Sequence, residues 1–202
     1  MIQKTARIVS WLFHPLVMPS IGILIIMFSN SYLANLPLEA KRLLVLLVSI
    51  GTLFLPALMI PVFLARGLVS TVNVNERKER ILPLIITSVF FVITFVLFLK
   101  IPVYRFIHAF ILGSAMVVIT NLLITIYWKI SAHMMGIGGI TALILVLSVY
   151  LHVNMLLLLM LAFLVGGITG TARIVLKSHS PAEIYLGFAA GFMLMTCSLV
   201  LY

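Results

Sequence analysis

The chain has very few acidic residues and a single cysteine. Among its 202 residues, Asp and Glu together number 4, all of them Glu, and Cys numbers 1, so an intrachain disulfide is excluded. Charged residues make up 8% of the chain, whereas soluble domains carry about a quarter. The HExxH, Walker-type and G-x-S-x-G motifs are absent. Hydrophobic residues make up 64%, which predicts an integral membrane protein, expected in a bacterial inner membrane.

Long apolar runs predict one domain over residues 1–202, an all-α polytopic membrane bundle of six to seven transmembrane helices. A membrane-spanning helix needs about 20 apolar residues. The first run contains His14, Pro15 and Pro19, so we expect it to be kinked or partly re-entrant. The fifth and sixth runs are joined by a very short connection and should form an antiparallel hairpin. The seven runs are 8–29, 43–65, 81–99, 105–127, 131–151, 154–171 and 182–201.

Counting helices places the polar clusters of the sequence at one end of the bundle. With seven spans, one membrane face carries the N-terminus, loop 66–80, segment 128–131 and loop 172–181. The other face carries loops 30–42, 100–104 and 152–153. The basic and histidine clusters near residues 77–80, 129–133 and 173–183 therefore converge on a single surface.

The net charge of +9 fits two interpretations. Basic loops beside anionic lipid headgroups explain it, and so does a site for an anionic ligand. The basic residues are scattered over short loops and form no single stripe, which argues against a nucleic-acid partner. Once the cations of the expected site are set aside, the remaining ones divide evenly between the two faces, so the orientation in the membrane stays open.

Residues 179–183 predict the start of the last helix. Ser180 would be the N-cap, Pro181 the first helical residue and Glu183 the acid of a capping box, which by itself explains Glu183. His179 would lie just before this helix N-terminus, where the helix dipole favours anions. A phosphate bound there would meet His179, free backbone N–H groups and Arg173.

His133 follows Ser131 at the start of the fifth apolar run, again at a helix N-terminus. A hydrogen bond to a neighbouring carbonyl would explain a single histidine there. The expected common face with His179 and Arg173 instead favours a site. The remaining histidines share no spacing with these and are interpreted as structural or interfacial: His14, His108 and His152. No segment has the ligand density of a metal cage, so we expect neither metal nor cofactor.

These motifs resemble those of the type 2 phosphatidic acid phosphatase superfamily of membrane lipid phosphatases, over residues 77–191. The family's third motif, S-R-x5-H-x3-D, is similar to Ala172-Arg173, His179 and Glu183. Its second motif, P-S-G-H, is similar to Ile130-Ser131-Ala132-His133. Its first motif, K-x6-R-P, is not intact, and the residues that stand near its place are Arg77, Lys78, Arg80 and Pro83, with Lys129 as a further candidate cation.

The resemblance implies a metal-independent hydrolase that acts on a lipid phosphate or diphosphate through a phosphohistidine. His179 would be the nucleophile, Glu183 would fix its tautomer, and His133 would be the general acid and then the general base. The implied phosphate-binding residues are Arg173, Ser131, Arg80, Lys78, Arg77 and Lys129. Candidate substrates are isoprenyl diphosphate, phosphatidic acid, phosphatidylglycerophosphate and lipid A phosphate, of which short loops favour the slender isoprenyl chain.

Two other functions fit the same sequence. A binder or transporter of anionic lipids would keep the basic site without needing a nucleophile. A structural membrane subunit is the other alternative, because Gly187-x-x-x-Gly191 permits close helix contact and offers a homodimer interface.

Overall fold

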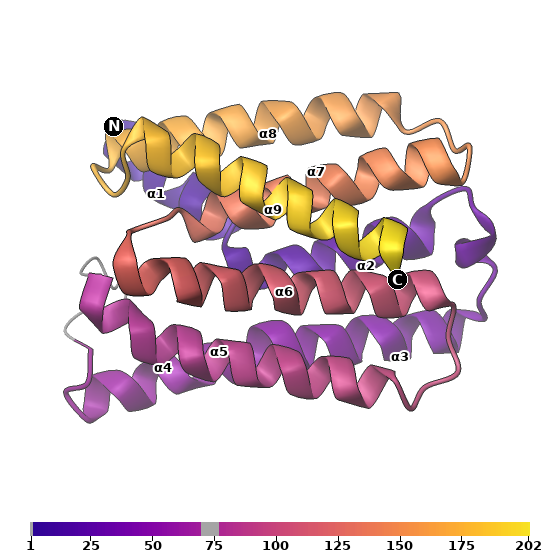
Figure 1. The fold of residues 1–202 in the computed structure, drawn as a ribbon, viewed down its shortest axis with the longest axis horizontal. Coiled ribbons are helices and arrows are strands. Elements are labelled where there is room, and N and C mark those ends of the chain that lie inside the picture. Colours follow the sequence, from indigo (N-terminus) through magenta and orange to yellow (C-terminus); the bar gives the residue numbers. More distant parts are fainter. Residues whose placement is uncertain (1, 70–76) are drawn as a thin grey trace.

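The computed structural model describes residues 2–69 and 77–202, and within these ranges the chain is a bundle of helices without strands (Figure 1). Seven helical segments of the described ranges are long and apolar enough to cross a membrane. The predicted all-α polytopic fold is therefore confirmed.

The first span is broken in its middle. It consists of α1 (Ile2–Leu12), the 3-10 turn η1 (Pro15–Val17) and α2 (Met18–Phe28). His14 has an extended backbone, with φ −65° and ψ 138°. A proline disfavours helical geometry in the residue before it, so Pro15 accounts for the break. The predicted kink is confirmed.

The second span is also composite, because a π-helical turn joins two α-helices. Gly51 lies in that turn, and a Cβ there would meet Oγ1 of Thr94 at 2.0 Å. The missing side chain thus lets this span approach the next helix closely. Its elements, after the 3-10 turn η2 (Tyr32–Ala34), are α3 (Leu38–Ser49), η3 (Ile50–Phe54) and α4 (Leu55–Ala65).

The other five spans are single helices, two of which extend beyond their apolar runs. α5 begins at Arg77 instead of residue 81, and α8 continues to Val175 instead of ending at residue 171. Basic residues expected in loops therefore lie on helix ends, since Lys and Arg are good helix formers outside the hydrocarbon region. The five helices are α5 (Arg77–Phe98), α6 (Arg105–Tyr127), α7 (Ala132–Tyr150), α8 (Leu156–Val175) and α9 (Pro181–Leu201).

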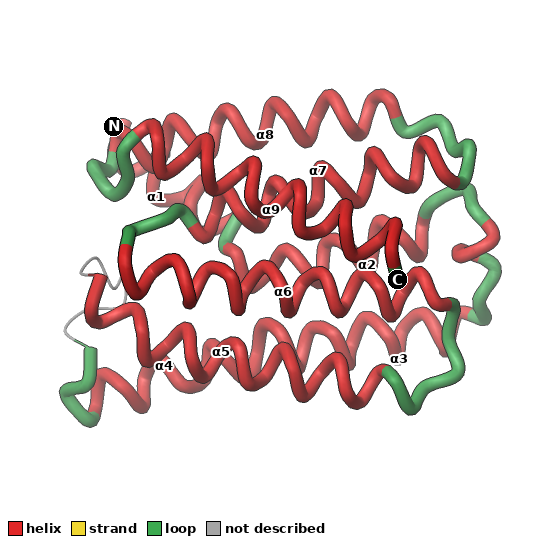
Figure 2. Tube along the Cα trace, in the orientation of Figure 1, coloured by secondary structure: helices red, strands yellow, loops and turns green. Residues whose placement is uncertain are grey.

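The connections gather at two opposite ends of the bundle (Figure 2). The N-terminus, segment 128–131 and segment 176–180 lie at the end where α5 begins (Figure 1). Segments 29–37, 99–104 and 151–155 lie at the other end. The division of the connections between two faces is thus confirmed for the described residues, whereas residues 70–76 of the predicted loop 66–80 lie outside them. We call the end that carries the N-terminus the site end.

α7 is the central helix of the bundle. In its most apolar window 61% of the residues are buried, against 22% for α5. Glycines bring α9 directly onto α7: a Cβ at Gly138 would lie 2.2 Å from the carbonyl oxygen of Phe188, and one at Gly191 would lie 1.9 Å from that of Met135. The Gly187-x-x-x-Gly191 motif, expected to offer a dimer contact, is therefore used for packing within the chain.

Side chains at the end opposite the site end contact a backbone carbonyl and aromatic rings. The His108 Nε2 atom lies 2.8 Å from the carbonyl oxygen of Phe98. Two of its cations lie over rings, Arg105 over Tyr202 and Lys41 over Phe28. The contact between His108 and Phe98 is consistent with the interpretation of His108 as structural or interfacial.

Candidate functional site

His179 and Glu183 form a pair at the start of α9. The His179 Nδ1 atom lies 2.6 Å from Oε2 of Glu183. Ser180 caps α9 by accepting from the Glu183 N–H at 3.4 Å, and Glu183 Oε2 accepts from the Ser180 N–H at 3.4 Å. The predicted capping box is confirmed. Glu183 has two roles, because the same oxygen that caps the helix also accepts from the imidazole.

The His179 side chain is almost completely buried, with 1% of its area exposed. Burial lowers the pKa of His179 to about 4; the hydrogen bond to Glu183 opposes this shift, and the charges of Arg80 and Arg173 add to it. The ring is therefore neutral at pH 7. With Nδ1–H donated to the carboxylate, Nε2 carries the free lone pair.

Ser131 joins the start of α7 to the first turn of α9. Its N–H donates to the carbonyl oxygen of Glu183 at 3.3 Å. This approach depends on Gly187, where a Cβ would lie 3.0 Å from the carbonyl oxygen of Ser131. The Ser131 hydroxyl is fully buried and has no hydrogen-bond partner among the described residues. A buried hydroxyl without a partner costs free energy, so it marks a place where a ligand would be stabilising.

Arg173 supplies a second buried donor without a partner. It lies in the last turn of α8 and is 8% exposed. Its Nε has no hydrogen-bond partner among residues 2–69 and 77–202. Its charge acts on His133, His179 and Lys129, so the guanidinium lies within electrostatic range of all three. A buried guanidinium with an unused N–H donor is suited to bind an oxyanion.

Arg80 and Lys129 add two more cations. Arg80 lies in the first turns of α5 and interacts electrostatically with Glu183 and Arg173. Burial lowers the pKa of Lys129, and the charge of Arg80 lowers it further. We call this group of residues the charged cluster: Arg80, Lys129, Ser131, His133, Arg173, His179 and Glu183.

His133 is held by a carbonyl far away in the sequence. Its Nε2 lies 3.0 Å from the carbonyl oxygen of Ser10. Because a carbonyl only accepts, Nε2 carries the proton, and Nδ1 is the nitrogen left for exchange with a ligand. The bond to a carbonyl that the sequence analysis considered is present, but the carbonyl belongs to α1 and not to a neighbouring residue.

His14, which the sequence indicates to be structural or interfacial, contacts a residue of the charged cluster. Its ring centroid lies 5.5 Å from that of His133, with the ring planes at 79°. The His14-Pro15 break was the only sequence signal that set this histidine apart. Position along the chain could not reveal the pairing, because packing of the first span against α7 creates it.

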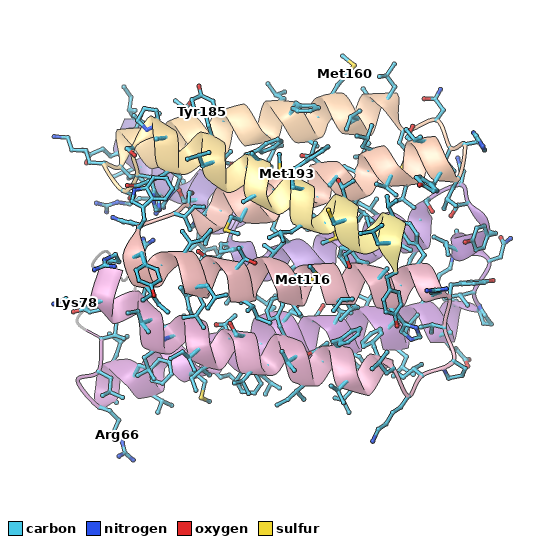
Figure 3. The ribbon with its side chains drawn as sticks, in the orientation of Figure 1. Arg66, Lys78, Met116, Met160, Tyr185 and Met193 are labelled. Atoms are coloured by element: carbon cyan, nitrogen blue, oxygen red, sulfur yellow. The ribbon has the colours of Figure 1, made fainter. Side chains whose placement is uncertain are left out.

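Two predicted phosphate-binding residues lie outside the charged cluster. Arg77 donates to the carbonyl oxygens of Thr125, at 3.4 Å, and Ile126, and so caps the end of α6. Lys78 is exposed and points away from the bundle at the site end (Figure 3). Both residues lie in the first turn of α5, where the Arg77 guanidinium is taken by the end of α6 and the Lys78 side chain is exposed.

The charged cluster combines three kinds of group. It has a neutral imidazole with a free nitrogen, a second imidazole whose Nδ1 is left for proton exchange, and cations in excess of the carboxylate. Such a set can bind a phosphate and transfer it to a histidine. The chain matches no protein-family model, no curated protein and no solved structure.

Proposed function

We propose that the protein is a membrane lipid phosphatase related to the type 2 phosphatidic acid phosphatases. The observation that carries the proposal is the pairing of His179 with Glu183 near the buried donors of Arg173 and Ser131, which have no partner among the described residues. These donors are available to a phosphate that binds near the pair.

In the first chemical step, Nε2 of His179 attacks the phosphorus of the substrate. The Nε2–P bond forms, the bond from phosphorus to the lipid oxygen breaks, and its electron pair stays on that oxygen. The negative charge of the bound phosphate favours protonation of His133 at Nδ1 as well, and His133 gives this Nδ1 proton to the leaving oxygen. Glu183 stabilises the positive charge that develops on His179.

In the second step, water cleaves the phosphohistidine. Neutral His133 takes a proton from the water at Nδ1, the water oxygen bonds to phosphorus, and the Nε2–P bond breaks. Inorganic phosphate leaves, and both histidines return to their starting states. Arg173, Arg80 and Lys129 stabilise the phosphoryl oxygens throughout, which is the main demand of phosphoryl transfer.

The position of the cluster supports a lipid substrate. It lies at one end of a membrane bundle, where a headgroup would be. A cavity with a mainly apolar lining includes Ala132, the residue before His133, and Pro15, the residue after His14. Its other lining residues include Met18, Met135 and Ile140. The first carbons of a lipid chain fit such a lining.

The experiment measures phosphate release from phosphatidic acid, isoprenyl diphosphate and phosphatidylglycerophosphate by the purified protein in detergent. We expect turnover that persists in EDTA, since arginine and lysine carry the charge stabilisation. The His179→Ala variant should lose about 10³-fold or more in kcat. His152→Asn is the matched control, because His152 lies at the opposite end with φ 52°, a backbone angle that asparagine tolerates.

Two outcomes would contradict the proposal. A His179→Ala protein with wild-type turnover would remove the nucleophile. Substrate binding without turnover, and without a trapped phosphohistidine, would instead support the anionic-lipid binder.

A further inference from the structure

We infer that His14 is a positioning residue of the proposed phosphatase site. Together with the Ser10 carbonyl, it holds the His133 ring with Nδ1 available for proton transfer. This inference rests on the proposed function. It makes the first span part of the site, although the motifs that resemble the family begin only at residue 77.

The break in the first span frees the carbonyl that His133 uses. α1 ends at Leu12, and Phe13 N–H still donates to Val9 at 3.0 Å. In a continuing helix the next amide, that of His14, would donate to Ser10. The extended backbone of His14 ends the helix first, so the Ser10 carbonyl is left for the imidazole of His133.

A glycine on α7 brings the break against the His133 ring. Gly136 follows His133 by about one helical turn, so the two residues share a face of α7. A Cβ at Gly136 would lie 2.8 Å from Cγ of Met18 and 3.7 Å from Cα of Pro15. The absence of a side chain at Gly136 therefore lets the broken segment pack against α7 about one turn from His133.

His14 is itself fixed by its own backbone. The Leu16 N–H donates to Nδ1 of His14 at 3.4 Å and orients the ring. The ring then packs nearly perpendicular to His133. With the ring of His14 on one side and the Ser10 carbonyl at Nε2, His133 cannot rotate without losing a contact. The first span thus fixes both the plane and the tautomer of the proposed proton donor.

Two variants separate the ring contact from the local backbone role. Asparagine keeps an acceptor for the Leu16 N–H but has no ring, whereas phenylalanine keeps a ring but has no acceptor. We expect His14→Asn to lower kcat for alkyl phosphates about tenfold or more, with KM little changed, because a misplaced acid–base group loses part of its catalytic contribution. His14→Phe should retain most of the turnover.

The measurement compares phosphatidic acid with nitrophenyl phosphate. The nitrophenolate leaves without a proton donor, so its release in the first turnover should keep its rate in His14→Asn. Later turnovers should slow and the phosphohistidine should accumulate, because hydrolysis of the phosphohistidine still needs His133. We expect a burst of nitrophenolate and more quench-trapped phosphoenzyme than in the wild type. A purely structural role would lower the first-turnover rates of both substrates equally and reduce the burst amplitude.

The outcomes distinguish the two proposals. An active wild type with an unaffected His14→Asn, or with an equal loss of first-turnover rate for both substrates, would overturn the role of His14 alone. A wild type that forms no phosphoenzyme and releases no phosphate would overturn the proposed function and this inference with it.

Discussion

Replacement of Gly191 by alanine tests how closely α9 packs against α7. The new Cβ would lie 1.9 Å from the carbonyl oxygen of Met135, and 2.6 and 2.7 Å from the backbone carbon atoms of the same residue. Ordinary contact begins at 3.4 Å. If the helices separate along this contact, α9 must move away by about 1.5 Å, the difference between that limit and the shortest distance.

The cost follows from which atoms obstruct the methyl group. Overpacking typically costs about 1–3 kcal/mol, and here the obstructing atoms are backbone and cannot rotate aside, so we expect about 3 kcal/mol or more. The displacement also pulls on the hydrogen bond between Ser131 and the carbonyl of Glu183. Since a misplacement of about 1 Å can cost about 10²-fold in rate, phosphate release should fall together with stability.

The assay is reversible unfolding in detergent, followed by tryptophan fluorescence. Gly139→Ala is the matched control, because it faces the same helix pair and its Cβ would have no neighbour closer than 3.7 Å. Gly167→Ala is a second control, with nothing within 4 Å. All three changes gain the same helix propensity, about 1 kcal/mol, so their differences report the clash. Equal unfolding free energies for Gly191→Ala and Gly139→Ala would refute the packing argument.

Three further predictions concern the charged cluster. Glu183→Gln should keep the capping box, since glutamine also serves at that position, and its unfolding free energy should stay within about 0.5 kcal/mol of the wild type. Its kcat should nevertheless fall by about 10²–10⁴-fold. If loss of folded protein accounts for the whole loss of activity, Glu183 has only its capping role. Ser131→Ala should be as stable as the wild type or about 1 kcal/mol more stable, because it removes a buried hydroxyl that has no partner in the described part of the chain. Inorganic phosphate and vanadate should inhibit this variant more weakly than the wild type, and unchanged inhibition would argue against a ligand at this hydroxyl. For His179, the folded pKa of about 4 lies below the ordinary 6.5, so the stability it contributes is complete above pH 6.5 and declines as the pH falls toward 4. We expect the unfolding free energy to drop by about 2–3 kcal/mol between pH 7.5 and 4.5 in the wild type relative to His179→Asn, and parallel pH curves would contradict the buried neutral ring.

The helical fold and the common end of the polar clusters could be predicted from the sequence. Membrane spans follow from apolar run length, and the faces follow from counting helices. The start of α9 was also predictable, because Ser180, Pro181 and Glu183 define it through local hydrogen bonds alone. These features depend on neighbours in the chain.

The features that the sequence did not reveal depend on tertiary contacts or on helix ends outside the apolar runs. Arg77 carries the charge of a phosphate ligand, but the free carbonyls at the end of α6 take its guanidinium. His14 and Ser10 reach His133 only because α1 ends early and the turn after it packs on α7. The close contact between Gly191 and the backbone of Met135 likewise depends on how α9 packs against α7, which the sequence does not specify locally. The relation to the lipid phosphatases stays a prediction.

The gathering of every proposed reactive group at one end of the bundle has a consequence for reconstitution. Vesicles assembled from detergent incorporate such a protein in either orientation. Molecules whose site end faces the lumen would be shielded from an impermeant substrate added outside, so part of the activity would be latent. Permeabilising the vesicles would uncover that hidden fraction, and its size would report the orientation of the molecules without any label on the protein.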